Sequence, residues 1–139
     1  MRALHTFLFG LIVGVSGVLL AGCGGRGDQR TSQVAGGVTY QGKPVPAGSI
    51  LFSPAAPGGG PAGYADIVEG RYNTAETGKG VSGGAYSVVI SGFDGNAAPD
   101  DEMPLGRQLF PEYATTLEIA RDSDVVHDFA VPSRGRSSR

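Results

Sequence analysis

The sequence contains one cysteine, two histidines and no tryptophan. A single thiol has no partner for an intrachain disulfide, so the fold must depend on packing and backbone pairing. Beyond residue 22 the only histidine is His127, which cannot by itself supply the three or four ligands of a usual zinc site. Charged residues make up 17% of the chain and the formal net charge is −2. That balance excludes the strongly basic surface of a nucleic-acid-binding protein.

The one long apolar run lies at the N-terminus, from Phe7 to Leu20, after a short start that carries Arg2. This is the pattern of a signal peptide, because a run of about 14 residues is shorter than the ~20 needed to cross a bilayer. The run ends in Leu20, Ala21, Gly22 and Cys23. These four residues resemble the lipobox of bacterial lipoproteins, in which two small residues precede the cysteine that receives the lipid.

The lipobox resemblance implies that residues 1–22 are a cleaved leader and that the Cys23 thiol carries a covalent lipid with acyl chains such as palmitate. Several acyl chains would hold the chain on a membrane, since one chain alone binds marginally. Gly24, rather than aspartate, follows the cysteine, and by the sorting rule of some bacterial lipoproteins this favours the outer membrane. We expect a lipid-anchored envelope protein, with residues 23–33 as a flexible tether.

The rest of the chain favours short strands over helices. The sequence holds 24 glycines and nine prolines, which disfavour long helices and are typical of strands joined by tight turns. Alternating apolar residues at Tyr86, Val88 and Ile90 predict a strand with one buried face. Strands are predicted at 34–40, 49–53, 63–68, 71–74, 85–91, 115–120 and 125–131. We therefore expect an antiparallel, seven-stranded, Ig-like β-sandwich over residues 34–132, followed by a disordered basic tail at 133–139.

Residues 109–120 allow a second interpretation. Pro111 suits the first turn of a helix, and such a helix would carry Tyr113, Leu117 and Ala120 on one side. The strand is favoured because this segment is rich in β-branched residues, which pack well on a pleated sheet.

The order of turns and strands resembles a known family. Val38 to Phe52 reads V-T-Y-Q-G-K-P-V-P-A-G-S-I-L-F, Gly84 to Ile90 reads G-A-Y-S-V-V-I, and Pro111 to Val131 contains P-E-Y, T-T-L-E-I and D-F-A-V. These segments are similar to carboxypeptidase-regulatory-like, or transthyretin-like, domains found in bacterial lipoproteins. The resemblance covers about residues 34–132. It implies a prealbumin-like sandwich without catalysis of its own.

An acidic segment is the one candidate metal site. Asp94, Asp100, Asp101 and Glu102 place carboxylates in a single predicted loop. Such oxygen ligands suit Ca²⁺, but the spacing of an EF-hand is absent. We interpret the segment as a solvated acidic loop, with weak calcium binding as the alternative. We interpret His127 as a structural residue, and apart from the lipid at Cys23 no cofactor is expected.

The motifs favour binding over catalysis. The sequence has no nucleophile elbow, zinc-protease motif or phosphate-binding loop, so we expect no enzymatic activity. The first hypothesis is a structural or adaptor module that contacts another envelope protein, for which an exposed sheet edge would serve. The alternative is a module that binds a polysaccharide or other cell-wall ligand through loops at 54–63 and 92–108. The expected partners are thus the membrane and an envelope protein or glycan, and not nucleic acid.

Overall fold

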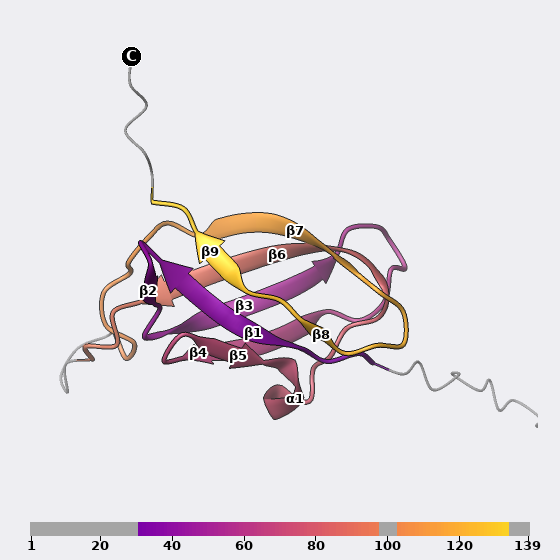
Figure 1. The fold of residues 1–139 in the computed structure, drawn as a ribbon, viewed down its shortest axis with the longest axis horizontal. Coiled ribbons are helices and arrows are strands. Elements are labelled where there is room, and N and C mark those ends of the chain that lie inside the picture. Colours follow the sequence, from indigo (N-terminus) through magenta and orange to yellow (C-terminus); the bar gives the residue numbers. More distant parts are fainter. Residues whose placement is uncertain (1–30, 98–102, 134–139) are drawn as a thin grey trace, which may run out of the picture.

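The computed structural model describes residues 31–97 and 103–133, and it is an all-β fold with one very short helix (Figure 1). The expected all-β class is confirmed. The elements are β1 (Val34–Tyr40), β2 (Lys43–Pro44), β3 (Ala47–Pro54), β4 (Gly63–Val68), β5 (Arg71–Asn73), α1 (Thr74–Thr77), β6 (Gly84–Phe93), β7 (Tyr113–Ile119), β8 (Val125–Val126) and β9 (Phe129–Val131).

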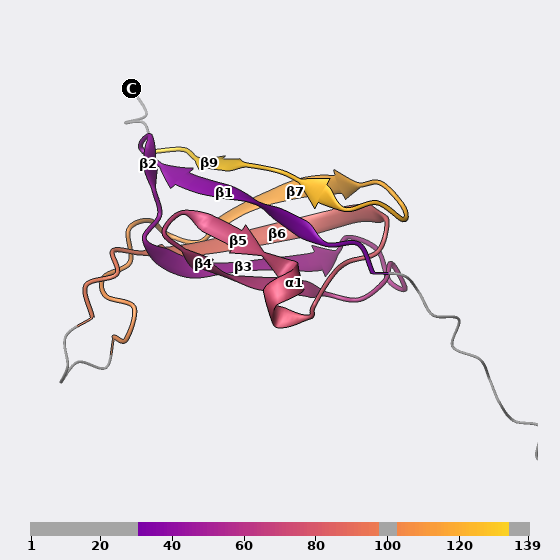
Figure 2. The same ribbon diagram turned by 60° about the horizontal axis from the view of Figure 1, so that its bottom comes forward.

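The strands form one sheet in the order β2-β1-β5-β4-β3-β6-β7, which curls on itself so that its two halves face each other. Figure 1 shows β1 and β9 crossing in front of β3 and β6, and the turned view of Figure 2 shows β1 and β9 above β3 and β4. Pairing is antiparallel along this path, whereas β8 and β9 pair with β1 in parallel. The expected antiparallel arrangement therefore holds for the path from β2 to β7. The two parallel pairs, β1 with β8 and β1 with β9, lie along the other edge of β1.

The core is built from the inward faces of β3 and β6. Tyr86, Val88 and Ile90 are fully buried, as their alternation predicts, and β3 contributes Ile50 and Phe52 from the neighbouring strand. Burying an aliphatic or aromatic side chain of this size contributes about 1.5–3 kcal/mol. The long β3–β6 ladder is thus the stable centre against which β1 and β9 pack.

The fold turns over at the hairpin between β4 and β5. Glu69 and Gly70 both have positive φ, 49° and 77°, which is the geometry of the tightest hairpin turns. The Gly70 carbonyl accepts a hydrogen bond from the Val38 N–H at 2.8 Å, so the turn is fixed to β1. The hairpin thereby joins β4, which pairs with β3, to β5, which pairs with β1.

Two local predictions differ from the structure, and one open alternative is decided. The segment after β5 forms the one-turn helix α1, whose N-terminus is capped by Asn73, so Thr74 begins this helix and does not end the strand predicted at 71–74. The strand favoured over a helix at 109–120 is confirmed, since residues 113–119 form strand β7. The last predicted strand, 125–131, is divided into β8 and β9, and this division together with the two-residue β2 gives nine strands instead of seven.

Candidate functional site

Strand β7 ends the sheet with an unpaired edge. The Gly92 carbonyl of β6 accepts from the N–H of Leu109 at 2.9 Å, and Leu109 lies on the segment that leads into β7. The even-numbered residues of β6 therefore point their backbone N–H and carbonyl groups toward β7. The register pairs Tyr86 with Leu117 and Ile90 with Tyr113. Since backbone groups alternate in direction along a strand, the groups that point away from the sheet belong to Ala114, Thr116 and Glu118.

This edge is unprotected within the described part of the chain. Within that part β7 pairs with β6 alone, no turn or loop hydrogen bond reaches the outward backbone groups of Ala114, Thr116 or Glu118, and all three residues are exposed. Figure 1 shows β7 along the upper margin of the molecule, and the nearby strand β9 pairs with β1 and not with β7. Proteins usually protect such edges with lysine, proline, bulges or very short strands. The seven residues of β7 contain no lysine or proline, and their only charged side chain is Glu118 near the end of the strand.

The opposite edge, formed by β8 and β9, is interrupted. Both strands keep the same offset to β1, with Val34 beside Val125 and Val38 beside Phe129. Pairing lapses between them at His127 and Asp128. In a regular parallel ladder the Gly37 N–H would donate to the His127 carbonyl, because the His127 N–H donates to the Ala35 carbonyl at 2.9 Å.

Two side chains replace the missing ladder bond. The Gly37 N–H donates instead to Oδ1 of Asp128 at 2.6 Å, and the hydroxyl of Tyr72 donates to the His127 carbonyl at 2.7 Å. The His127 carbonyl lies over Gly36, where a Cβ would be only 1.9 Å from its oxygen. A residue without a side chain is therefore required at Gly36, and the interruption depends on three positions far apart in the sequence.

The buried environment of Tyr72 keeps its hydroxyl protonated. Burial raises the pKa of this hydroxyl well above the usual value, and the nearby Asp128 carboxylate raises it further. The ring also packs 5.9 Å from that of Phe129 and 6.1 Å from that of Phe52. His127 places its ring edge-on against Phe129, with 4.6 Å between centroids. Tyr72 thus connects the core to the crossing segment, defined as residues 127–128, which cross Gly36.

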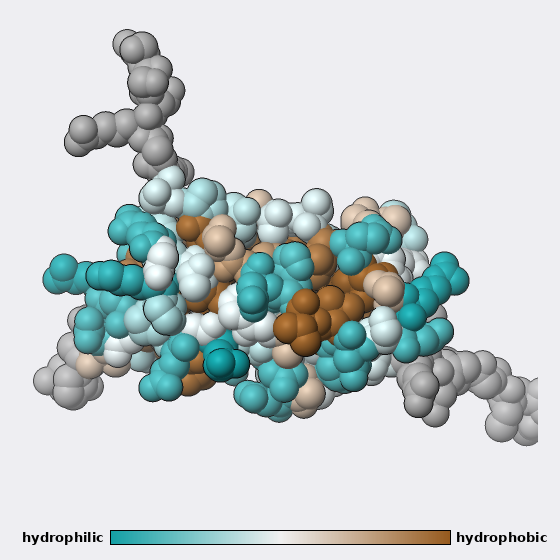
Figure 3. Space-filling model, viewed as in Figure 1, coloured by the Kyte–Doolittle hydropathy of each residue, from teal (hydrophilic) through white to brown (hydrophobic). Residues whose placement is uncertain are grey.

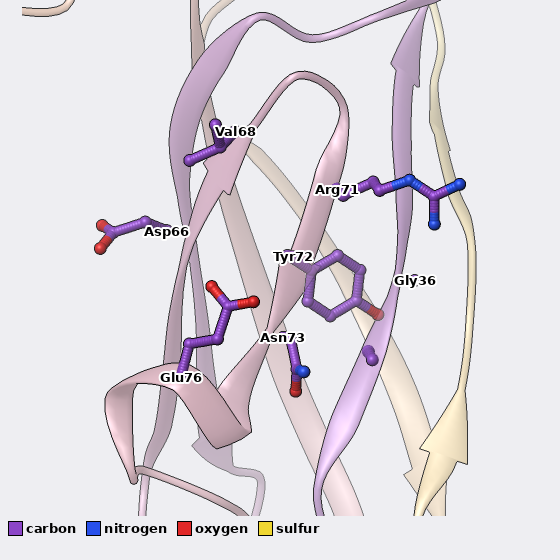
Figure 4. A pocket seen from close by; sticks show the side chains of 8 residues that line it. Gly36, Asp66, Val68, Arg71, Tyr72, Asn73 and Glu76 are labelled. Atoms are coloured by element: carbon purple, nitrogen blue, oxygen red, sulfur yellow. The ribbon is translucent and has the colours of Figure 1, made fainter.

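Two adjoining hollows lie on the outside of β1 and β5. The first, of about 480 Å³, is lined by charged and amide side chains of Asp66, Arg71, Asn73 and Glu76. Figure 4 shows the Arg71 guanidinium extending over β1, away from the carboxylates of Asp66 and Glu76. The second, of about 670 Å³, shares Arg71 and reaches Val126. The first hollow is lined by polar and apolar surface in equal measure, whereas the second is mainly apolar and includes Val126 and Phe129.

The face that carries β8 has little exposed apolar surface. Figure 3 shows a small hydrophobic patch over β8, surrounded by hydrophilic side chains. Val126 is 81% exposed there, the largest value among the big hydrophobic side chains of the described residues. A single valine is ordinary for a protein surface and does not by itself mark a binding site.

The tyrosines do not form an exposed row. Tyr86 is fully buried, and its hydroxyl accepts from the Ser82 N–H at 3.0 Å and donates to the Pro61 carbonyl at 3.1 Å. It thereby fixes the 54–63 loop. Tyr64 is half-buried and donates to Asp66 Oδ1 at 2.7 Å, which raises the pKa of the Tyr64 hydroxyl. All five tyrosines lie in the described part of the chain and each is buried or half-buried, so they offer no exposed aromatic row to a glycan.

The acidic segment is described only at its start. Asp94 Oδ1 accepts from the N–H groups of Asn96 and Arg107, each at 3.0 Å. The hydrogen bond from Asn96 is the main cause of the lowered pKa of the Asp94 carboxyl. Asp100, Asp101 and Glu102 lie outside the described residues. Within residues 31–97 and 103–133, no three His, Cys, Asp or Glu side chains are grouped to hold a metal.

The predicted anchor also lies outside the described residues. The structure does not describe the leader 1–22, the lipobox Leu20, Ala21 and Gly22, or the lipid site Cys23. It also does not describe most of the 23–33 tether or residues 134–139 of the tail. Among the residues that are described, no helix is long and apolar enough to cross a membrane.

Sequence reasoning named a sheet edge as a docking element without locating it. The pattern of β7 indicates its strand but not its position in the sheet, which depends on pairing across distant residues. The Gly36, Tyr72 and Asp128 arrangement was missed, and the Gly36–Gly37 pair inside a predicted strand was its only sequence signal. Comparison of the chain with protein-family models, with curated proteins and with solved structures gives no match.

Proposed function

We propose that this protein is a non-catalytic, lipid-anchored module of the bacterial cell envelope that contacts another protein chain through the open edge of β7. The observation that carries the proposal is the set of unpaired backbone groups at Ala114, Thr116 and Glu118. An extended segment that adds to a sheet edge gains main-chain hydrogen bonds, and side-chain pockets add specificity.

The scaffold behind the edge supports this role. β7 is paired with β6 along its whole length, and β6 with β3, so the edge belongs to the most extensively paired part of the sheet. A rigid edge loses little conformational entropy when a partner strand is added. The finer fold proposed is the prealbumin-like sandwich of carboxypeptidase-regulatory-like domains, supported by the facing halves of the curled sheet and by the sequence segments quoted above.

The membrane anchor is proposed from the sequence alone. The four residues that end in Cys23 support attachment of lipid to its thiol and retention in the envelope, with the outer membrane favoured by Gly24. The intact mass of the chain from producing cells tests this directly. We expect residues 23–139 plus a glyceryl unit with about three acyl chains. A Cys23→Ala chain that stays on membranes would contradict the anchor.

The docking proposal is tested by a photoreactive residue placed at Thr116 in the full chain. Irradiation of cells should give a covalent adduct with a protein at this position. The control carries the same residue at Ser53, on the outer side of β3 and two strands away from β7. It lies about 14 Å from any strand added at the edge, because neighbouring strands are ~4.8 Å apart. A protein adduct at neither position, or equally at both, would refute the role of the edge.

A second candidate function is binding of a polysaccharide or cell-wall ligand. It is favoured by the hollows that meet at Arg71, whose carboxylate, amide and guanidinium groups can all hydrogen-bond sugar hydroxyls. Titration with cell-wall glycan fragments, followed by calorimetry, tests it. Binding should be lost in Arg71→Ala and kept in Arg107→Ala, which removes an exposed arginine on the 94–107 loop. Absence of heat with every fragment would remove this candidate.

A further inference from the structure

The open edge of β7 is flanked by opposite charges. Glu112 lies just before the strand and Arg121 just after it, and both are exposed. Glu112 has one weak internal contact, a 3.4 Å hydrogen bond from the Ser91 hydroxyl. When two copies of one strand pair in antiparallel orientation, the start of each lies beside the end of the other. Two copies of β7 would therefore place acid beside base at both ends of the pair.

The unpaired groups of the edge also favour one register. They belong to Ala114, Thr116 and Glu118, a symmetrical set around Thr116. If Thr116 lies opposite Thr116 of a second copy, then Ala114 of each copy lies opposite Glu118 of the other. Every edge-directed N–H and carbonyl of the three residues then has a partner, which gives six hydrogen bonds across the pair.

Other symmetrical registers use fewer of these groups. Centring the pair on Glu118 would place two carboxylates directly opposite each other, which destabilises a strand pair. Centring it on Ala114 would place Glu118 of each copy opposite Phe110, outside β7 of the other copy, so the backbone groups of Glu118 would have no partner strand. The Thr116 register keeps the two Glu118 side chains apart and sets two threonines side by side, a favourable cross-strand pair. It also places Glu112 of one copy opposite Ala120 of the other, one residue away from Arg121.

We propose that the partner of β7 is a second copy of this chain, joined by antiparallel β7–β7 pairing about a two-fold axis at Thr116. The inference rests on the proposed docking role of the edge and names its occupant. The pairing extends the β3–β6–β7 ladder into one sheet that runs through both copies. It also covers the half-buried Leu117, which packs against the core beside the open edge, with Thr115 of the other copy.

Disulfide trapping of the full chain tests both the pairing and its register. Residues in a hydrogen-bonded antiparallel pair have Cα atoms about 5.5 Å apart, within the range that a disulfide spans. In cells producing the full chain, Thr116→Cys should give a disulfide-linked homodimer after mild oxidation. Ala114→Cys and Glu118→Cys should not when produced alone, because like positions are four residues out of register. A mixture of these two variants should give a heterodimer. The unsubstituted chain, with Cys23 only, gives the background.

A charge-exchange experiment separates pairing from a change in folding. Arg121→Glu places Glu112 of each copy beside a carboxylate, and Glu112→Arg places Arg121 beside a guanidinium. In the Thr116→Cys background each change should weaken the dimer by roughly tenfold, since two exposed ion pairs become repulsive. Mixing the two variants restores acid beside base at both ends and should restore the cross-link. Unchanged yields in all of these combinations would overturn the proposal.

The photoreactive residue at Thr116 separates failure of this inference from failure of the proposed function. An adduct of twice the chain mass that contains only peptides of this protein supports both. An adduct with a different protein, together with no Thr116→Cys disulfide, overturns the self-pairing and leaves the docking role in place. Absence of any protein adduct and of any disulfide overturns both.

Discussion

The two long edges of this sheet are treated in opposite ways. The β8–β9 edge is divided into strands of two and three residues by the interruption at His127 and Asp128. The β7 edge runs for seven residues with no break in its pairing to β6. Both are exposed sheet margins of one molecule, so the difference between them cannot come from the solvent or from the overall composition.

The comparison indicates where the chain resists strand addition. At the β8–β9 edge, the backbone of residues 127–128 is turned into the molecule and held by Tyr72 and Asp128, so an added strand would meet a broken ladder. Pro132 follows directly after β9 and donates no hydrogen bond. β2, the remaining edge, consists only of Lys43 and Pro44. Among the strands of residues 31–97 and 103–133, only β7 retains a long, regular row of free groups, which agrees with a dedicated docking role.

The largest expected effect comes from filling the space under the interruption. Gly36→Ala places a Cβ 1.9 Å from the His127 oxygen, so the crossing segment must move and the Tyr72 hydrogen bond is lost. We expect a loss of about 3 kcal/mol in the free energy of unfolding, measured by urea denaturation. Gly37→Ala is the matched control. Its Cβ would meet the Asp128 side chain at 3.2 Å and the Gly70 carbonyl at an ordinary contact distance of 3.6 Å, so its stability should stay within about 1 kcal/mol of the wild type. Equal effects of both changes would contradict this account.

The next effect concerns the hydroxyl of Tyr72. Tyr72→Phe keeps the ring in the core and leaves the His127 carbonyl without its donor, which should cost about 1–3 kcal/mol. Tyr86→Phe is a control of the same chemistry at the other end of the core. It should loosen the 54–63 loop without affecting residues 127–128. Amide chemical shifts of His127 and Asp128 distinguish the two variants, and a Tyr72→Phe chain with unchanged shifts there would speak against the bond.

Tyr72 also makes stability depend on alkaline pH. An unfolded tyrosine loses its proton near pH 10, whereas the raised pKa of folded Tyr72 keeps it protonated at that pH. Its contribution to the free energy of unfolding is therefore complete below pH ~10. It falls as the pH rises further, by up to about 1.4 kcal/mol per unit. Subtracting the pH profile of Tyr72→Phe from that of the wild type should isolate this slope, and parallel profiles above pH 10 would refute it.

A smaller effect is expected at Asp128, whose carboxylate replaces a backbone carbonyl. Asp128→Ala leaves the Gly37 N–H without this acceptor and should cost about 1 kcal/mol. Asp128→Asn retains an oxygen in the same place and should recover most of that loss. If Asn and Ala destabilise equally in urea denaturation, the charge of Asp128, rather than its acceptor, holds the segment.

The contrast between the edges also marks the limit of sequence reasoning. Alternation at Tyr86, Val88 and Ile90 predicts both the strand and its buried face, because this pattern is local. The same reasoning predicts an unbroken strand at 125–131, although Val125 and Phe129 belong to two strands. The break depends on a glycine 91 positions earlier and on Tyr72, neither of which affects the local pattern.

The docking edge is likewise partly visible in the sequence. The β-branched residues around Thr116 indicate a strand, but any predicted strand can be central or terminal in the sheet. Its terminal place follows from the order of pairing, in which β6 lies between β3 and β7. Glu112 and Arg121 indicate a charged pair across an edge only once that order places β7 at the end of the sheet. The strand predicted at 115–120 is confirmed, and the alternative helix at 109–120 is not formed because β7 gains a full ladder with β6, whose backbone bonds and buried side chains outweigh the local preference at Pro111.

The last expected effect leaves stability unchanged and appears only in amide exchange. The Arg121→Glu chain should be mostly monomeric. In it the N–H groups of Ala114, Thr116 and Glu118 should exchange fast with solvent, whereas those of Thr115 and Leu117 should exchange slowly because they are bonded to β6. In the unsubstituted chain all five should be slow, because the second copy pairs the outer three. The edge-directed amides of Val126 and Ala130 should exchange fast in both chains, since no partner strand forms at the interrupted edge. Slow exchange of the three outer β7 amides in Arg121→Glu would mean that residues of the same chain already cover them, and the distinction between the two edges would then be lost.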